Sequence, residues 1–197
     1  MIEVIIGIST TIIGVAGTLS AIWFKHYLQK KNQTECIIDR TVQEDSEILD
    51  RLEEMKNEVK ADRISIFSFH NGGEYYSGKS MQKLSCSYEV VQPGVARTQL
   101  ELQNIPVSAC LATVQQLIQN KEFHCYDVET HYPESACKHQ LIQHGVKSTY
   151  QYAIFDLNRR AIGILRADFV LDKEEISGDA YDALRYLAIK LPGYLVK

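Results

Sequence analysis

The longest uncharged run in the chain lies at its amino-terminal end, and it decides which solvent that segment occupies. Residues 4–24 read VIIGISTTIIGVAGTLSAIWF, without one charged side chain. At ~1.5 Å rise per residue, a helix over this run spans the roughly 30 Å hydrocarbon core of a bilayer. The run is too long for an ordinary buried core helix, so we expect one transmembrane helix here.

A cleaved signal peptide is the alternative for this segment. It fits less well, because no basic residue precedes the run and the apolar stretch exceeds the usual ~7–15 residues. Lys25, Lys30 and Lys31 follow the run instead. By the positive-inside rule, residues 1–31 then form a retained single-pass anchor with its basic flank, and the carboxyl-terminal domain lies in the cytoplasm.

Two features of the amino-terminal third favour a homodimer. Small residues four apart in the uncharged run would let two membrane helices approach closely, and these pairs are Gly7/Thr11, Thr10/Gly14 and Gly17/Ala21. Residues 32–61 follow as a connecting amphipathic helix, with one apolar stripe formed by Ile48, Leu52, Met55 and Val59. This stripe suits a short coiled coil or packing of the helix on its own domain.

Composition excludes one class of partner and indicates a redox state. The formal net charge of -4 leaves no basic surface for nucleic acid. The five cysteines are an odd number without framework spacing, so we expect reduced thiols, in agreement with a cytoplasmic domain.

Residues 62–197 predict one α+β domain. Runs rich in β-forming residues, and periodic runs with helix caps, indicate an antiparallel sheet with helices packed on it. The expected strands are residues 63–69, 84–91, 123–128 and the hairpin 148–157/161–170, and the expected helices begin near Pro106, Glu134 and Ser177.

Three segments of this domain resemble the GAF domains, sensory modules related in architecture to PAS domains. They are GVKSTYQYAIFDLNRRAIGILRADF from Gly145, YDVETHYP from Tyr126 and ADRISIFSFHNG from Ala61. The resemblance covers about residues 40–191. It implies a GAF/PAS-like antiparallel sheet flanked by helices, with a pocket between the sheet and the segments that cross it, which holds a small molecule or stands empty.

The resemblance implies a ligand-binding set in this pocket, although an ordinary core or turn explains the same residues. The candidates are Phe67, Phe69, His70, Tyr75, Tyr76, Cys86, Tyr88, Cys110, Asp127, Tyr150 and Tyr152. In members that attach a bilin to cysteine, the attaching position corresponds here to Ala136, and Cys137 falls where the family has histidine. We therefore expect no bilin. The family's cyclic-nucleotide pattern has no counterpart either, and the cofactor stays unknown.

No catalytic or metal site is predicted. The densest group of metal-ligating residue types lacks the spacing of a structural zinc site. Its members are His124, Cys125, His131, Cys137, His139 and His144.

The sequence thus predicts a membrane-anchored, GAF-like sensory or protein-interaction module without catalytic output, which passes its signal through the membrane helix or to a separate output protein. Two alternatives stay open. Residues 71–77, behind a single amino-terminal span, loosely resemble the holin of T-even phages, a membrane-lesion protein whose globular domain lies outside the cytoplasm. A thiol-dependent redox enzyme that uses a GAF-type pocket is the other.

Overall fold

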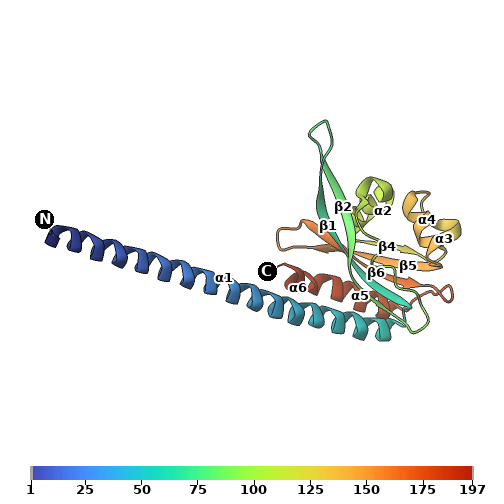
Figure 1. Ribbon diagram of the computed structural model, residues 1–197. Helices are drawn as coiled ribbons and strands as arrows, with labels where there is room; N and C mark the ends of the chain where they lie inside the picture. The colour runs from blue at the N-terminus through green and yellow to red at the C-terminus, as the bar shows by residue number, and fades with distance from the viewer. Residues whose placement is uncertain (1, 197) are drawn as a thin grey trace. The chain divides into compact units, whose positions relative to one another are not determined.

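The computed structural model describes the backbone of residues 2–196 and the side chains of residues 18–30 and 37–196 (Figure 1). The chain divides into two units, Met1–Ser46 and Glu47–Lys197. The first unit is helical and forms the amino-terminal part of α1 (Ile2–Val59). Most of the predicted membrane span and its small-residue face lie outside the side chains that are described. Across the described residues, no helix combines the length and the apolar character that a membrane crossing requires.

The second unit contains a six-stranded sheet in the order β3-β2-β1-β6-β5-β4, in which all neighbours are antiparallel. The strands are β1 (Arg63–Glu74), β2 (Ser80–Val91), β3 (Ile105–Pro106), β4 (Glu122–Cys125), β5 (Ser148–Phe155) and β6 (Ala161–Phe169). The helices are η1 (Val107–Cys110), α2 (Leu111–Asn120), α3 (Val128–His131), α4 (Ala136–Gln143), α5 (Gly178–Lys190) and α6 (Pro192–Leu195). The predicted α+β architecture is confirmed.

Helices cover both faces of this sheet (Figure 1). On one face, the last turns of α1 and the apolar side of α5 pack on Ile64, Leu165 and Ala167. The predicted stripe of α1 is buried here, with Leu52 fully inaccessible to solvent. Of the two interpretations of this stripe, packing on its own domain is therefore the one that the structure shows. On the other face, η1 and α2 pack on Phe67 and Ile164.

The first strand differs from the prediction, which placed its end at Phe69 and a tight turn at residues 70–73. β1 continues to Glu74, and the turn closes where the Tyr75 amide donates to the Lys79 carbonyl at 2.9 Å. A register shift between Asn71 and Glu74 accommodates Gly73, whose φ of 107° suits glycine. The glycines indicated a turn, whereas the chain uses them within a β-hairpin arm that extends beyond the rest of the sheet (Figure 1).

Candidate functional site

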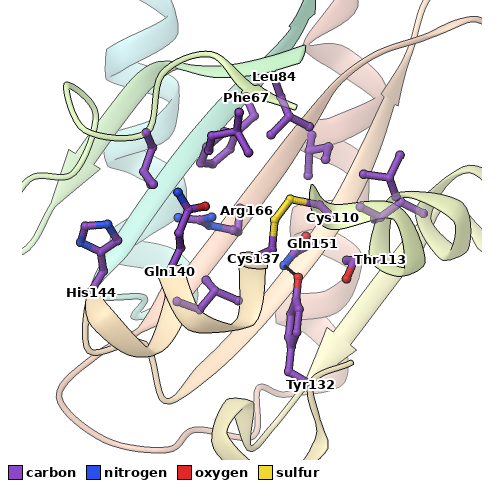
Figure 2. Close-up of a pocket in the computed structure, with 16 residues that line it drawn as sticks. Phe67, Leu84, Cys110, Thr113, Tyr132, Cys137, Gln140, His144, Gln151 and Arg166 are labelled. Carbon is purple, nitrogen blue, oxygen red and sulfur yellow. Dashed lines mark hydrogen bonds between the residues drawn. A yellow bond between two sulfur atoms is a disulfide. The ribbon is translucent and has the colours of Figure 1, made fainter. Parts of the chain in front are cut away.

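A cavity of about 40 Å³ lies between the sheet and the segments η1, α2 and α4 (Figure 2). Its walls are mostly apolar, and they come from sequence-distant parts of the domain. The lining residues are Phe67, Leu84, Leu102, Ile105, Cys110, Thr113, Val114, Leu117, Tyr132, Cys137, Gln140, Leu141, His144, Gln151, Ile164 and Arg166. This volume is large enough for a small number of water molecules.

One side of the cavity is polar. Gln151 of β5 donates from Nε2 to the Tyr132 hydroxyl at 3.4 Å, as the dashed line in Figure 2 marks. Burial raises the pKa of the Tyr132 hydroxyl, which therefore stays protonated at neutral pH. The buried hydroxyl of Thr113 lies beside the Tyr132 hydroxyl, and among the described residues no partner meets the full geometry of a hydrogen bond with it. These groups offer hydrogen bonds to whatever occupies the cavity.

Arg166 extends this polar side into a buried ion-pair network on the same face of β1, β2 and β6. Arg166 Nε lies 3.0 Å from Asp168 Oδ2, and Arg63 lies between Asp168 at 3.6 Å and Glu89 at 3.4 Å. The Arg166 guanidinium also sits 4.5 Å from the centre of the Phe67 ring. Two cations and two anions balance, so the network fixes Arg166 at the cavity wall without adding net charge.

The Glu89 carboxylate also anchors the irregular segment 92–104, which connects β2 to β3. It accepts hydrogen bonds from the Thr98 amide at 2.9 Å, the Thr98 hydroxyl at 2.7 Å and the Gln99 amide at 3.2 Å. A buried carboxylate needs such donors to offset its lost hydration. Since this segment supplies Leu102 to the cavity, the ion-pair network also holds one of the cavity's walls.

A disulfide between Cys110 and Cys137 forms part of the wall, with the Cα atoms 5.3 Å apart (Figure 2). The expectation of reduced thiols is therefore wrong for this pair. The two residues are separated by 27 positions, and only folding brings η1 against α4. Cys86 and Cys125 are free and buried, and burial raises the pKa of the Cys86 thiol to about 12, so this thiol is a poor nucleophile.

Local sequence places α4 over the cavity. The Ser135 side chain caps the helix by accepting a hydrogen bond from the Lys138 amide, and Gly145 follows the helix at a φ of 71°. Between these signals, Cys137, Gln140 and Leu141 recur at helical spacing on the side that lines the cavity. The short helix thus presents one face to the site.

Of the predicted ligand-binding residues, Phe67 and Cys110 line the cavity. Phe69 and Cys86 belong to the same apolar cluster, although neither contributes to the cavity wall. Phe67, Phe69 and Cys86 therefore lie on the cavity face of the sheet, and Cys110 lies in η1, which covers that face.

Three predicted tyrosines lie on the opposite face. Tyr88, Tyr150 and Tyr152 pack with the core under α1 and α5. His124 lies against Tyr150 and Tyr152 with ring centres 5.6 and 5.3 Å away, and against Tyr181 of α5 at 4.7 Å. Burial raises the pKa of both strand tyrosines and lowers that of His124. This aromatic group is separated from the cavity by the sheet.

The remaining predicted residues lie on the hairpin arm or at a helix cap. His70, Tyr75 and Tyr76 belong to the β1–β2 arm, and Tyr76 is fully exposed at its tip. Asp127 caps α3 and pairs with Lys173 at 2.5 Å, and this hydrogen bond lowers the pKa of Asp127 to about 2. None of these four residues lines the cavity.

The sequence did contain a signal for two cavity residues that the prediction omitted. Gln151 and Arg166 are polar residues within β5 and β6, where most of the neighbouring residues are apolar and buried. Polar residues at buried strand positions need hydrogen-bond partners or a ligand, so Gln151 and Arg166 could have been chosen as candidate site residues. Gln140 and Thr113 gave no comparable signal, because polar residues are ordinary on a helix surface.

Comparison with known proteins identifies the fold. No family model matches the chain, and no curated protein matches it. Among solved structures, the GAF domain of PixJ from Thermosynechococcus elongatus, in its blue-light absorbing form, has a TM-score of 0.62 at 14% identity, covering 79% of this chain and 85% of that one. The domain has the GAF fold.

Two other solved GAF-type structures agree. A far-red cyanobacteriochrome photoreceptor has a TM-score of 0.60 at 16% identity, covering 84% of this chain and 96% of that one. The phycocyanobilin-bound GAF domain of a cyanobacterial phytochrome also has a TM-score of 0.60, at 18% identity, covering 80% of this chain and 87% of that one. At such identities the likeness concerns the fold alone.

The residues of this GAF-like domain do not fit a bilin. The cavity of about 40 Å³ is far smaller than the ~300–1,000 Å³ that drug-sized ligands require, and a linear tetrapyrrole is larger than most of these. Cys137, the cysteine nearest the attaching position, is committed to a disulfide. The site suits a much smaller guest than the chromophore of the phytochrome domain.

Proposed function

We propose that this protein is a membrane-anchored, GAF-like sensory module that binds a small organic molecule in the cavity beneath α2 and α4. The observation that carries the proposal is the composition of the cavity wall, where an apolar interior meets a polar side formed by Thr113, Gln151 and Arg166. Binding sites for small molecules combine these two features, because apolar walls provide affinity and a small number of polar groups fix orientation.

The ligand proposed for this site is neutral, with one hydrogen-bonding end. Arg166 is already paired with Asp168, so the ion-pair network offers no spare positive charge to an anion. Gln151 and Thr113 offer an amide and a hydroxyl, which match a carbonyl or hydroxyl group of a guest. The apolar walls contributed by Val114 and Ile164 match the remainder of the molecule.

Anchoring and dimerisation complete the proposed module. The uncharged run 4–24 and the lysines after it support a single membrane span with the GAF domain in the cytoplasm. In the first unit, Ile37, Ile38 and Val42 of α1 are exposed apolar residues at helical spacing. A second copy of the helix would cover them. Without a catalytic output of its own, the module passes its signal through α1 or to a separate protein.

The proposal is tested with full-length protein purified in detergent. Val114→Phe fills the cavity, whereas Ile118→Phe places the same side chain one turn later on α2, where the native residue is exposed. Native mass spectrometry should detect a small molecule on the wild type and on Ile118→Phe, and none on Val114→Phe. If none of the three proteins carries a small molecule, and no neutral compound in a thermal-shift screen stabilises the wild type more than Val114→Phe, the ligand-sensing function is rejected.

A holin-like membrane-lesion function is the second candidate, and the disulfide favours it. Lasting disulfides form in oxidising compartments such as the periplasm, which is where this alternative places the domain. Alkaline phosphatase fused after Lys197 decides between the two topologies. We expect an inactive fusion and a fluorescent green fluorescent protein fusion at the same site; the reverse result would support the holin-like function.

A further inference from the structure

We propose that the Cys110–Cys137 disulfide is a redox-operated latch, which holds α4 closed over the cavity when oxidised and releases it when reduced. This inference rests on the proposed ligand site, for which it supplies the means of entry. The latch lies in the cavity wall itself, so its redox state bears directly on access (Figure 2).

The cavity needs a movable wall. At about 40 Å³, its closed form is several times smaller than a site for an organic ligand of ordinary size, ~300 Å³ or more. The sheet wall is rigid at one end, because the ion-pair network of Arg166 joins β1, β2 and β6 there. A guest must therefore enter by displacing one of the covering segments.

The weakest covering segment is α4. Leu141 is its one buried residue, and it joins a small cluster with Val128 and Val146. Neighbouring His139 and Ile142 are exposed. A helix of this length with so little buried apolar area depends on other attachments to stay in place.

The disulfide provides that attachment. Cys110 ends η1 and directly precedes α2, which is anchored by Val114 and Leu117, at 4% and 1% exposure. The bond therefore ties the loosely packed α4 to a firmly packed helix. When it is cut, α4 retains Leu141 and its backbone connections, and the wall formed by Cys137 and Gln140 is free to move outward.

The chemistry of release is thiol–disulfide exchange with a dithiol reductant. A thiolate of the reductant attacks the Cys137 sulfur, which belongs to the half-buried partner, and the Cys110 thiolate leaves and takes up a proton. The second thiol of the reductant then attacks the mixed disulfide and releases the Cys137 thiol. Two electrons pass to the protein, and the reductant becomes a disulfide. Cytosolic disulfides are commonly transient and redox-sensing, which agrees with a reversible latch in a cytoplasmic domain.

Hydrogen exchange tests the latch on full-length protein in detergent, with Cys36 replaced by serine in every sample to prevent cross-linking between molecules. With dithiothreitol, amides of residues 136–144 should exchange about tenfold faster or more, while those of β5 and β6 keep their rates. Cys137→Ser should show the faster exchange with and without reductant. Cys125→Ala, which removes a buried free cysteine, should keep the response to reductant.

A dye measurement separates this proposal from the ligand site. The fluorescence of the neutral dye N-phenyl-1-naphthylamine should rise on reduction of the wild type, and rise less in Val114→Phe. Faster exchange in α4 without any dye signal supports the latch and counts against the ligand site. Equal exchange rates of residues 136–144 in the oxidised and reduced wild type would overturn the latch, whatever the variants do.

Discussion

The two faces of one sheet are built for different purposes. Under α1 and α5 the face is closed and apolar, and Leu165 and Ala167 of β6 are fully buried there. Under α2 and α4, the same strand contributes Ile164 and Arg166 to a cavity wall and Asp168 to an ion-pair network. Alternating side chains let a single strand serve both faces. One face is therefore closed by apolar packing, whereas the other combines a cavity with a buried ion-pair network.

The largest expected change in stability comes from the ion-pair network on the cavity face. Asp168→Asn removes the carboxylate that compensates Arg63 and Arg166, and we expect a loss of about 3–5 kcal/mol in the free energy of unfolding, because the two cations stay buried. Urea denaturation measures it. Asp182→Asn, which breaks an exposed pair with Arg185 on the other side, should cost about 0–1 kcal/mol. Equal costs for the two variants would mean that the buried network is unimportant.

An intermediate change in the free energy of unfolding is expected when volume is added to each face, and it tests how tightly each face is packed. Ala167→Leu adds volume to the closed face and should lower the free energy of unfolding by about 1–3 kcal/mol, because no space awaits the larger side chain. Val114→Phe adds volume beside the cavity, which accommodates part of the larger side chain, and should cost less than Ala167→Leu. Thermal and urea denaturation compare the two. The opposite order would show that the cavity face is the more rigid one.

The smallest effect is a pH dependence on the closed face. Burial under Tyr181 lowers the pKa of His124 from its usual 6.5, so the unfolded chain takes up a proton before the folded domain does. The free energy of unfolding should therefore fall as the pH drops below about 6.5 and level off below the folded pKa. Urea titrations at pH 7.5 and 5.5 should show less difference for His124→Gln than for the wild type. An unchanged difference would assign the pH dependence to other groups.

Local signals were sufficient to predict much of the fold. Ser177 was expected to cap the last long helix, and its side chain accepts from the Ala180 amide. Gly145 was expected to close the helix before the hairpin, and it adopts a positive φ. The hairpin itself turns at residues 158–160, where Arg159 has a φ of 60°. Caps and turns depend on neighbouring residues alone, which explains why a single sequence can specify them.

The site was harder to predict, because its features depend on long-range packing. Tyr150 and Tyr152 were assigned to the pocket, whereas intervening Gln151 is the residue that faces it. β5 is buried along nearly its whole length, so no alternation of polar and apolar residues marks either face. The Cys110–Cys137 pair likewise has no local signature. Which side of a two-sided strand faces a cavity is decided by the helices that cover it.

The hydrogen bonds that Glu89 receives have an implication for how this domain can diversify. One carboxylate, held within the strand framework, fixes residues 92–104 through Thr98 and Gln99. Substitutions elsewhere in that segment would leave this attachment point intact while changing which side chains border the binding space. For the proposed ligand site, substitutions in residues 92–104 are therefore expected to change which ligand fits, while the sheet keeps its structure.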